Sequence, residues 1–227
     1  AIAAALVEAG ADLIELGIPF SDPLADGLTV QKTSFQALQQ GVNIHTSLDV
    51  VRRLRTNGVN APIVLMGYYN PFLRYGLAEF VRDAEAAGVD GLIVPDVPTE
   101  ESGPVSQLCQ THNICLVPMV APTSTDERIA QACKPARGFI YCVSVTGVTG
   151  ARSSLRQGLA ELVRRIRLHT DLPVLVGFGV SSSEHVEEIG QFADGAIVGG
   201  ALLDAIDKAP REMAVRTAGD FLKGLRS

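Results

Sequence analysis

One short unit recurs along this chain and limits the folds open to it. A helix-like pattern ends at a glycine, an aspartate follows two residues later, and a short apolar run comes next. Gly10 and Asp12 precede the run 13–16, and Gly88 and Asp90 precede the run 91–94. A weaker copy at 192–195 precedes the run 196–198. Glycine commonly ends a helix in the left-handed conformation, and short apolar runs are typical of parallel strands buried on both faces. The repeat therefore predicts helices and strands that alternate around one parallel sheet.

Further strands and helices follow from the same patterns. Apolar runs predict four more strands, at 62–66, 114–117, 138–142 and 173–176, which brings the count to about seven. Helices are expected between them at 77–87, 100–110, 126–133, 155–169 and 184–191. The pairs Ser124 with Glu127 and Ser181 with Glu184 have the spacing of a capping box at a helix N-terminus.

Regular alternation in a chain of 227 residues predicts one domain, 1–227, with the (β/α)8 TIM-barrel fold. The seven strands are one short of a closed barrel. Because residues 1–9 already read as the second half of a helix, we expect the first strand to be missing before residue 1 and the chain to be N-terminally incomplete. An open doubly wound sheet is the alternative. It is disfavoured because no G-x-G-x-x-G turn follows an early strand.

Composition argues against several classes of partner. The net charge of -6 disfavours nucleic acid, which calls for a basic surface. The four cysteines form no CxxC pair and have no histidine at metal-ligand spacing, so we expect no metal site. We find neither a signal peptide nor an apolar run long enough to span a membrane. We therefore expect a cytoplasmic protein that has neither a nucleic acid nor a membrane as a partner.

Two carboxylates are candidates for acid–base chemistry. Glu15 stands in an apolar strand, where it shares the inward face with Leu13 and Gly17. Poor solvation there raises the pKa of a carboxylate towards neutrality, although a buried Glu can also serve as a structural ion-pair partner. The stiff loop 19–27 follows and ends in Asp26 and Gly27. Asp26 is a second candidate, and ordinary turn chemistry is the alternative for an Asp-Gly pair.

The last loops favour a phosphate site. Glycines at 177, 179, 199 and 200 follow the last two expected strands, where barrel enzymes often bind phosphate through backbone N–H groups. Residues 141–151 are rich in Gly, Thr and Ser, which suits a mobile lid or else a flexible connection without a role.

Residues 15–27 closely resemble the signature of the tryptophan synthase α-subunit family. Residues 66–71, 95–98, 144–150 and 177–179 match the same family in the same order, and the match covers essentially the whole chain. Two substitutions depart from the usual pattern: Leu28 replaces a common proline, and Gly200 replaces a common serine. The expected first strand would also carry an apolar residue that contacts indole.

The resemblance implies a lyase that cleaves indole-3-glycerol phosphate to indole and glyceraldehyde 3-phosphate in tryptophan biosynthesis. Glu15 matches the catalytic glutamate that shuttles a proton to the indole ring carbon, and Asp26 matches the aspartate that holds the indole N–H. The remaining implied substrate-binding residues are Tyr68, Ile93, Tyr141, Thr149, Gly150, Gly177, Phe178, Gly179, Gly199 and Gly200. Thr149 lies in the lid, and Tyr68, Ile93 and Phe178 help to wall the indole pocket.

The resemblance also implies a partner, a β subunit that receives indole through a tunnel in an α2β2 heterotetramer. Pyridoxal phosphate belongs to that partner, and no cofactor is expected in this chain. The loop after Glu15 and the lid 143–152 are expected to face the partner. Two alternatives remain: a catalytically silent barrel that only activates a β subunit, and another phosphate-binding barrel aldolase or isomerase. A Schiff-base aldolase is disfavoured because we find no lysine inside a strand.

Overall fold

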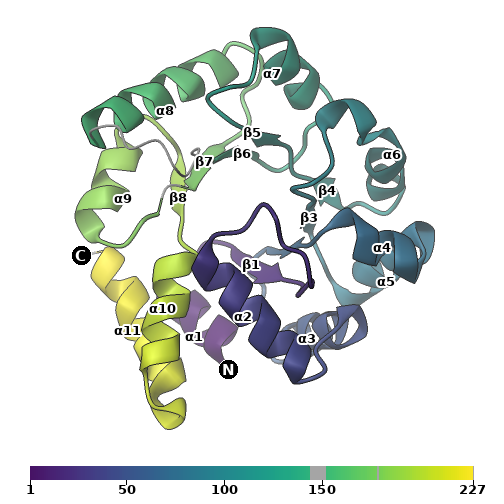
Figure 1. Cartoon of the computed structure of the whole chain (residues 1–227), viewed down its shortest axis with the longest axis vertical. Coiled ribbons are helices and arrows are strands. Elements are labelled where there is room, and N and C mark those ends of the chain that lie inside the picture. The colour runs from purple at the N-terminus through teal and green to yellow at the C-terminus, as the bar shows by residue number, and fades with distance from the viewer. Residues whose placement is uncertain (144–151, 178, 227) are drawn as a thin grey trace.

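Helices surround a ring of short parallel strands in a computed structural model that describes residues 1–143, 152–177 and 179–226 (Figure 1). In chain order the elements are α1 (Ile2–Glu8), β1 (Ile14–Gly17), α2 (Leu28–Gln39), α3 (Ile44–Thr56), β2 (Ile63–Met66), α4 (Tyr69–Tyr75), α5 (Leu77–Ala87), β3 (Gly91–Ile93), η1 (Thr99–Glu101), α6 (Gly103–Thr111), β4 (Cys115–Leu116), β5 (Met119–Val120), α7 (Asp126–Cys133), β6 (Ile140–Val143), α8 (Arg152–Ile166), β7 (Val174–Gly177), α9 (Ser183–Gly190), β8 (Gly195–Ile197), α10 (Gly200–Lys208), η2 (Arg211–Met213) and α11 (Ala214–Leu225).

The strands form two parallel sheets of four, in the orders β1-β2-β3-β4 and β5-β6-β7-β8. The expected strand 114–117 contains β4, and a further short strand that was not predicted, β5, follows it after Pro118. β4 pairs with β3, whereas β5 pairs with β6. Pro118 stands between them and has no N–H to donate, so the ladder passes from one neighbour to the other at this point. Each of the seven predicted strand positions therefore contains a strand, and β5 is an eighth that the sequence analysis did not predict.

The side chains of the strands separate an outer core from an inner one. Ile14 and Leu16 pack outward against the helices in one large cluster, and a second outer cluster forms around β6 and β7. The interior of the ring contains the buried side chains of Val64, Ile93 and Val117, among others, with Leu13 packed against them. Alternation along β1 therefore places Glu15 on the inner face, as predicted.

The recurring Gly-x-Asp unit has a structural cause. The carboxylate of Asp90 accepts the N–H of Ile63, the first residue of the neighbouring strand, at 2.7 Å. The guanidinium of Arg55, near the end of α3, pairs with Asp90 and also donates to the carbonyl of Gly88 at 2.9 Å. Gly88 itself has the left-handed φ of 91° that was predicted for it. Each unit thus ties a helix end, a turn and the start of the adjacent strand together.

The same contacts return at two other positions. Asp194 accepts the N–H of Val174 at 2.8 Å and pairs with Arg167, just after α8, at 3.0 Å. Asp12 pairs with Arg226, just after α11, at 3.4 Å, and Arg226 also donates to the carbonyl of Gly10. Within the described part of the chain no strand N–H is bonded to Asp12, and 94% of its side chain is exposed.

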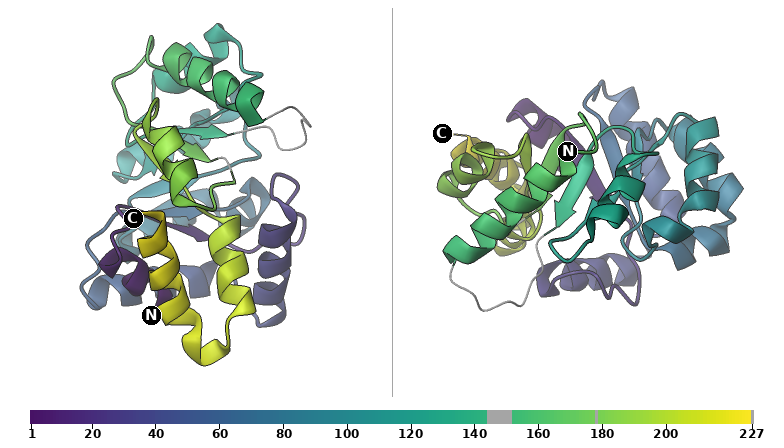
Figure 2. Two further views of the ribbon diagram at one scale, coloured as in Figure 1. Left: turned by 90° about the vertical axis from the view of Figure 1, so that its left-hand side faces the viewer. Right: turned by 90° about the horizontal axis from the view of Figure 1, so that it is seen from above.

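The exposed carboxylate of Asp12 lies just before β1, on the side where the ring of strands is interrupted. Over the described residues no ladder joins β8 to β1. The last helices lie across this side of the molecule: α11 packs against α1, and α10 packs against α2 (Figures 1 and 2). Helix contacts thus cover the side of the ring where strand pairing is missing.

Both expected helix caps are displaced by one residue. The side chain of Thr125, and not that of Ser124, accepts an N–H at the start of α7, while Ser124 accepts the N–H of Ala121. α9 begins after Ser182, not after Ser181. In both segments a hydroxyl residue stands next to the predicted one, so the spacing alone does not fix the cap. None of the helices in the described part of the chain is long and apolar enough to cross a membrane.

Candidate active site

Glu15 lies in the middle of β1 with its side chain on the inner face of the ring. It pairs in register with Val64 of β2, which belongs to the inner apolar cluster. Burial there raises its pKa to about 7, and the nearby charge of Asp26 adds to the increase. A carboxyl group with this pKa is present in both protonation states near neutral pH. Glu15 is therefore able to donate and to accept a proton.

Asp26 lies at the end of the loop that follows β1, and Tyr68 holds this end of the loop. The Tyr68 hydroxyl accepts the N–H of Ala25 at 2.9 Å and is hydrogen-bonded to the Asp26 carboxylate. Burial raises the pKa of Asp26, while the bond from Tyr68 opposes the increase. The ring of Tyr68 also stacks at a tilt on Phe20, with centroids 5.3 Å apart. Tyr68 therefore joins β2 to both ends of the acidic loop.

Tyr141 of β6 approaches the two carboxylates from the opposite half of the ring. Burial raises its pKa, and the negative charges of Glu15 and Asp26 raise it further. Its ring lies over Gly177 of β7, where a Cβ atom would come within 2.8 Å of the Tyr141 hydroxyl. Glycine at 177 thus leaves the space that the ring occupies. Three of the predicted site residues, Glu15, Asp26 and Tyr141, are brought together in this way.

Apolar side chains line the interior below these polar groups. Ile93, at the end of β3, is fully buried and belongs to the inner cluster with Met66 and Leu175. The side chain of Ile93 thus lies on the inner face of the ring, among apolar neighbours. Phe178, Thr149 and Gly150 lie outside the described residues, as does the central part of the expected lid.

The remaining glycines lie at the ends of β7 and β8. Gly179 has a φ of 52°, in the left-handed region, and no heavy atom lies within 4 Å of an added Cβ. Gly199 is the N-cap of α10, and Gly200 is its first residue. The first N–H groups of a helix have no partner within the helix, and its N-terminus carries partial positive charge. This end of α10 has the chemistry of an anion site.

Two supports of the site escaped the sequence analysis. The carboxylate of Asp96 accepts the N–H of Tyr69 at 3.0 Å, at the start of α4 and next to Tyr68. Gln31 of α2 donates to the carbonyl of Asp26 at 2.8 Å. The signals were present, because Asp96 stands three residues after β3 within the matched motif 95–98, and Gln31 is one helical turn after Gly27. Helix α2, which carries Gln31, and helix α4, whose first N–H Asp96 accepts, had not been predicted.

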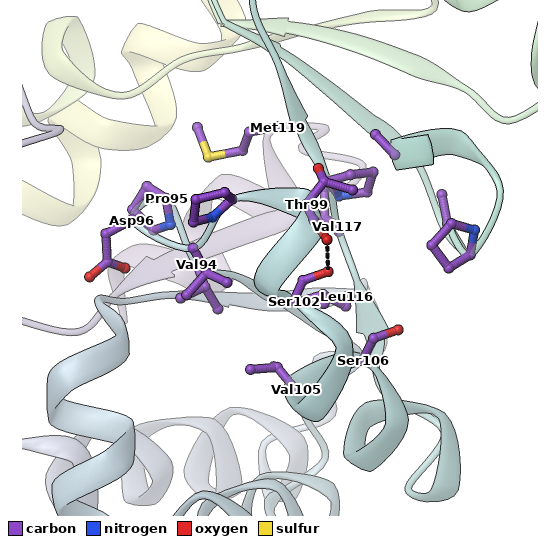
Figure 3. A pocket seen from close by; sticks show the side chains of 16 residues that line it. Val94, Pro95, Asp96, Thr99, Ser102, Val105, Ser106, Leu116, Val117 and Met119 are labelled. Atoms are coloured by element: carbon purple, nitrogen blue, oxygen red, sulfur yellow. Dashed lines mark hydrogen bonds between the residues drawn. The ribbon is translucent and has the colours of Figure 1, made fainter. Parts of the chain in front are cut away.

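A cavity of about 250 Å³ lies between α6, α7 and the strands β4 and β5 (Figure 3). Val94, Asp96, Met119 and Val105 are among the side chains that line it. The Ser102 hydroxyl in its wall is bonded to the carbonyl of Thr99 at 2.8 Å. Neither Glu15 nor Asp26 lines this cavity, so it is separate from the acid–base pair.

No group of three or more His, Cys, Asp or Glu side chains is placed to hold a metal ion, as far as the described residues extend. The groups that the structure describes at the site are two carboxylates, two phenols and backbone N–H groups.

Comparison with known proteins identifies relatives along the whole chain. The model of the family described as tryptophan synthase alpha chain matches residues 1–221. The tryptophan synthase alpha chain of Roseiflexus castenholzii is 53% identical over 225 residues, which are 99% of this chain and 86% of the relative. The crystal structure of tryptophan synthase subunit alpha from Legionella pneumophila superimposes with a TM-score of 0.90 at 34% identity, over 99% of this chain and 84% of that one. A chain of the tryptophan synthase complex from Pyrococcus furiosus gives a TM-score of 0.89 at 36% identity, over 99% of this chain and 90% of that one.

Proposed function

We propose, on the premise that this chain belongs to the tryptophan synthase α-chain family, that Glu15 and Asp26 carry out its reaction. Members of this family are lyases that cleave indole-3-glycerol phosphate in tryptophan biosynthesis. The observation that carries the assignment is a carboxyl group with a pKa of about 7 on the inner face of a barrel strand, coupled to a second carboxylate. The match to the family model supports the reaction, and this geometry supports the assignment of residues.

The carbon–carbon bond between the indole ring and the glycerol chain must break in this reaction. The ring carbon first needs a proton, which turns the indole into a better leaving group, and the glycerol hydroxyl must lose a proton as its carbon becomes a carbonyl. Protonated Glu15 delivers the first proton to the ring carbon. The resulting carboxylate then accepts the proton of the hydroxyl, so Glu15 returns to its starting state.

Positive charge develops on the indole nitrogen when the ring carbon is protonated. The Asp26 carboxylate accepts the indole N–H and stabilises this charge. Tyr68 holds Asp26 in position, and Tyr141 bounds the side of the active site opposite to it. Ile93 contacts the apolar face of the ring, and Phe178 completes this wall.

Backbone N–H groups hold the phosphate of the substrate. The glycines at 177, 179, 199 and 200 let these groups approach it, and the N-terminus of α10 attracts its charge. Thr149 and Gly150 cover the substrate from the lid.

The barrel acts as one domain, 1–227, in the cytoplasm and works with a β subunit in an α2β2 heterotetramer. The Pyrococcus furiosus relative was crystallised as a tryptophan synthase complex, which supports this assembly. Pyridoxal phosphate belongs to the β subunit, and the chain itself needs no cofactor for the cleavage.

Indole release from indole-3-glycerol phosphate tests the proposal. The wild-type chain is expected to release indole, and Glu15→Gln is expected to reduce kcat by about 10²–10⁴-fold, the usual contribution of a general acid–base group. Glu8→Gln on the exposed surface of α1 makes the same chemical change and is expected to leave the rate unchanged. A Glu15→Gln enzyme with more than about a tenth of the wild-type rate contradicts the assignment.

A further inference from the structure

Helix α2 is hydrogen-bonded to both ends of the loop that carries Asp26. At the start of the loop, the Ser34 hydroxyl accepts the N–H of Phe20 at 3.0 Å and bonds to the carbonyl of the same residue at 3.2 Å. At its end, the Gln31 side-chain amide donates to the carbonyl of Asp26 at 2.8 Å and lies 3.5 Å from that of Pro23. Ser34 and Gln31 are three residues apart, so they lie on one face of the helix.

The two contacts have different consequences for Asp26. Ser34 fixes the loop six residues before the carboxylate, whereas Gln31 bonds to the backbone of Asp26 itself. The Tyr68 hydroxyl holds the preceding N–H and the carboxylate from the other side. The backbone of Asp26 is thus fixed between α2 and β2, and its side chain is left with little freedom to turn.

A neutral donor is needed at position 31. The amide faces two backbone carbonyls, and the nearby Asp26 is a carboxylate, so a negative side chain there would be repelled. A positive side chain would form an ion pair with Asp26 and compete with the indole N–H. Glutamine satisfies the carbonyls and leaves the charge of Asp26 available to substrate.

We propose that Gln31 is a positioning residue for the cleavage reaction, which acts by fixing the backbone of Asp26 so that its carboxylate faces Glu15 and the indole N–H. The inference rests on the proposed function of Asp26. A displacement of about 1 Å in a catalytic group can cost about a hundredfold in rate, so the effect belongs to kcat more than to substrate binding.

Two substitutions remove the donor in different ways. Gln31→Glu keeps the shape but places an acceptor against the Asp26 carbonyl, and Gln31→Met keeps the length without polar atoms. Gln39→Glu, at the exposed end of the same helix, is the matched control. Both Gln31 variants are expected to lower kcat by about ten- to a hundredfold with KM within about threefold, while the control keeps the wild-type values.

The titration of Glu15 separates positioning from a general loss of structure. The titratable groups around Glu15 are Asp26 on the loop and Tyr141 on β6, and the charge of Asp26 is part of what raises the Glu15 pKa. If Asp26 turns away, the pKa of Glu15 falls in the uncharged Gln31→Met variant, measured by carbon-13 NMR of the labelled carboxyl group without substrate. A Gln31→Met chain with an unchanged Glu15 pKa, or Gln31 variants with wild-type kcat, overturn the inference.

The same experiment distinguishes this inference from the proposed function. A wild-type chain that releases no indole counts against the reaction, whereas the NMR titration still reports whether Gln31 orients Asp26. Circular dichroism and the thermal midpoint of each variant show whether it is folded. A Gln31→Met chain that is folded and shows no titration shift overturns the inference even if Gln31→Glu fails to fold.

Discussion

Glu15 stands between two residues that have ordinary packing roles. Ile14 and Leu16 both contribute to the outer core, while the single carboxylate faces an apolar interior. An apolar residue at 15 would pack there without a desolvation cost. The site thus carries a local instability, because the charged form of Glu15 is disfavoured by burial and by Asp26.

This instability predicts a pH dependence of folding. The pKa of Glu15 is about 7 in the folded state against an ordinary value of 4.5. The folded state therefore binds the extra proton between these values, and the stabilisation is fully present below the unfolded pKa and is lost as pH rises through about 7. The unfolding free energy of Glu15→Gln minus that of wild type is therefore expected to increase by about 2–3 kcal/mol from about pH 5 to about pH 8.

Urea denaturation of both chains at the two pH values measures this gain. The exposed Glu8→Gln chain serves as the control and should follow the wild type at both. A constant difference between Glu15→Gln and wild type would mean that Glu15 titrates alike in the folded and unfolded states.

At the scale of single elements, the sequence predicts best where packing repeats. The strand 14–17 and the turns at Gly10 and Gly88 follow from alternation and from the left-handed glycine. Helices α2, α3, α4, α10 and α11 were not predicted. The absence of buried residues in α2 and α10 explains those two, because their apolar positions do not mark a core face. Leu28 is an example, because 85% of its surface is exposed. Helices α3 and α11, in contrast, do bury residues and were missed all the same.

Contacts between elements set the rest of the site. Asp26 was predicted from its motif, yet its partners Tyr68 and Gln31 come from other elements whose register the local sequence does not specify. The presence of β5 similarly depends on the ladder that β6 offers after Pro118. Motif residues, Tyr68 among them, could thus be named from the sequence, whereas the contacts that orient Asp26 required the fold.

The Asp–Arg contact at the start of β7 is expected to stabilise the fold. Asp194 accepts the Val174 N–H and pairs with Arg167, and these bonds lower its pKa, with the backbone N–H as the larger cause. Asp194→Ala is expected to cost about 1–2 kcal/mol at neutral pH, because the strand N–H loses its acceptor. The exposed Asp171→Ala is the nearby control.

The lowered pKa also fixes the pH window of this effect. Stabilisation by the Asp194 carboxylate is present above its ordinary pKa of 3.8 and is lost as pH falls through the lower folded-state value. Urea midpoints of wild type and Asp194→Ala should therefore converge in strong acid. Midpoints that already coincide at neutral pH would show that the contact contributes nothing.

The phosphate assignment gives a second prediction at this scale. Gly200→Asp adds a negative side chain at the N-terminus of α10, where space is open around the Cβ. We expect KM for indole-3-glycerol phosphate to rise at least about tenfold, because like charges repel at short range. Gly190→Asp, at the exposed end of α9, is the control.

Crystals soaked in sulfate should show the anion between Gly179 and Gly200, and an anion found only elsewhere on the surface counts against the site.

For the whole molecule, the open side of the ring is the feature with the largest energetic consequence. β1 and β8 each pair with a single neighbouring strand among the residues described, and α10 and α11 cover this side from outside. Unpaired strand edges expose backbone donors and acceptors, and an incomplete barrel exposes its apolar interior. The ion pair of Asp12 and Arg226 at this edge has the form of the other two, without the strand N–H that Asp90 and Asp194 accept.

A strand placed between β8 and β1 is therefore expected to stabilise the protein. We expect a chain extended ahead of Ala1 by a turn and four apolar β-branched residues to unfold at higher urea concentration, with a gain of about 2–4 kcal/mol after the entropy of ordering the strand. The first N–H of the new strand should bond to Asp12, as Ile63 bonds to Asp90. Asp12→Asn should consequently lower the stability of the extended chain by about 1 kcal/mol and that of the original chain by less. An extension in which Ser and Gly replace the apolar residues controls for added length. Equal urea midpoints for the apolar and the Ser/Gly extensions would show that the gap does not accept a strand.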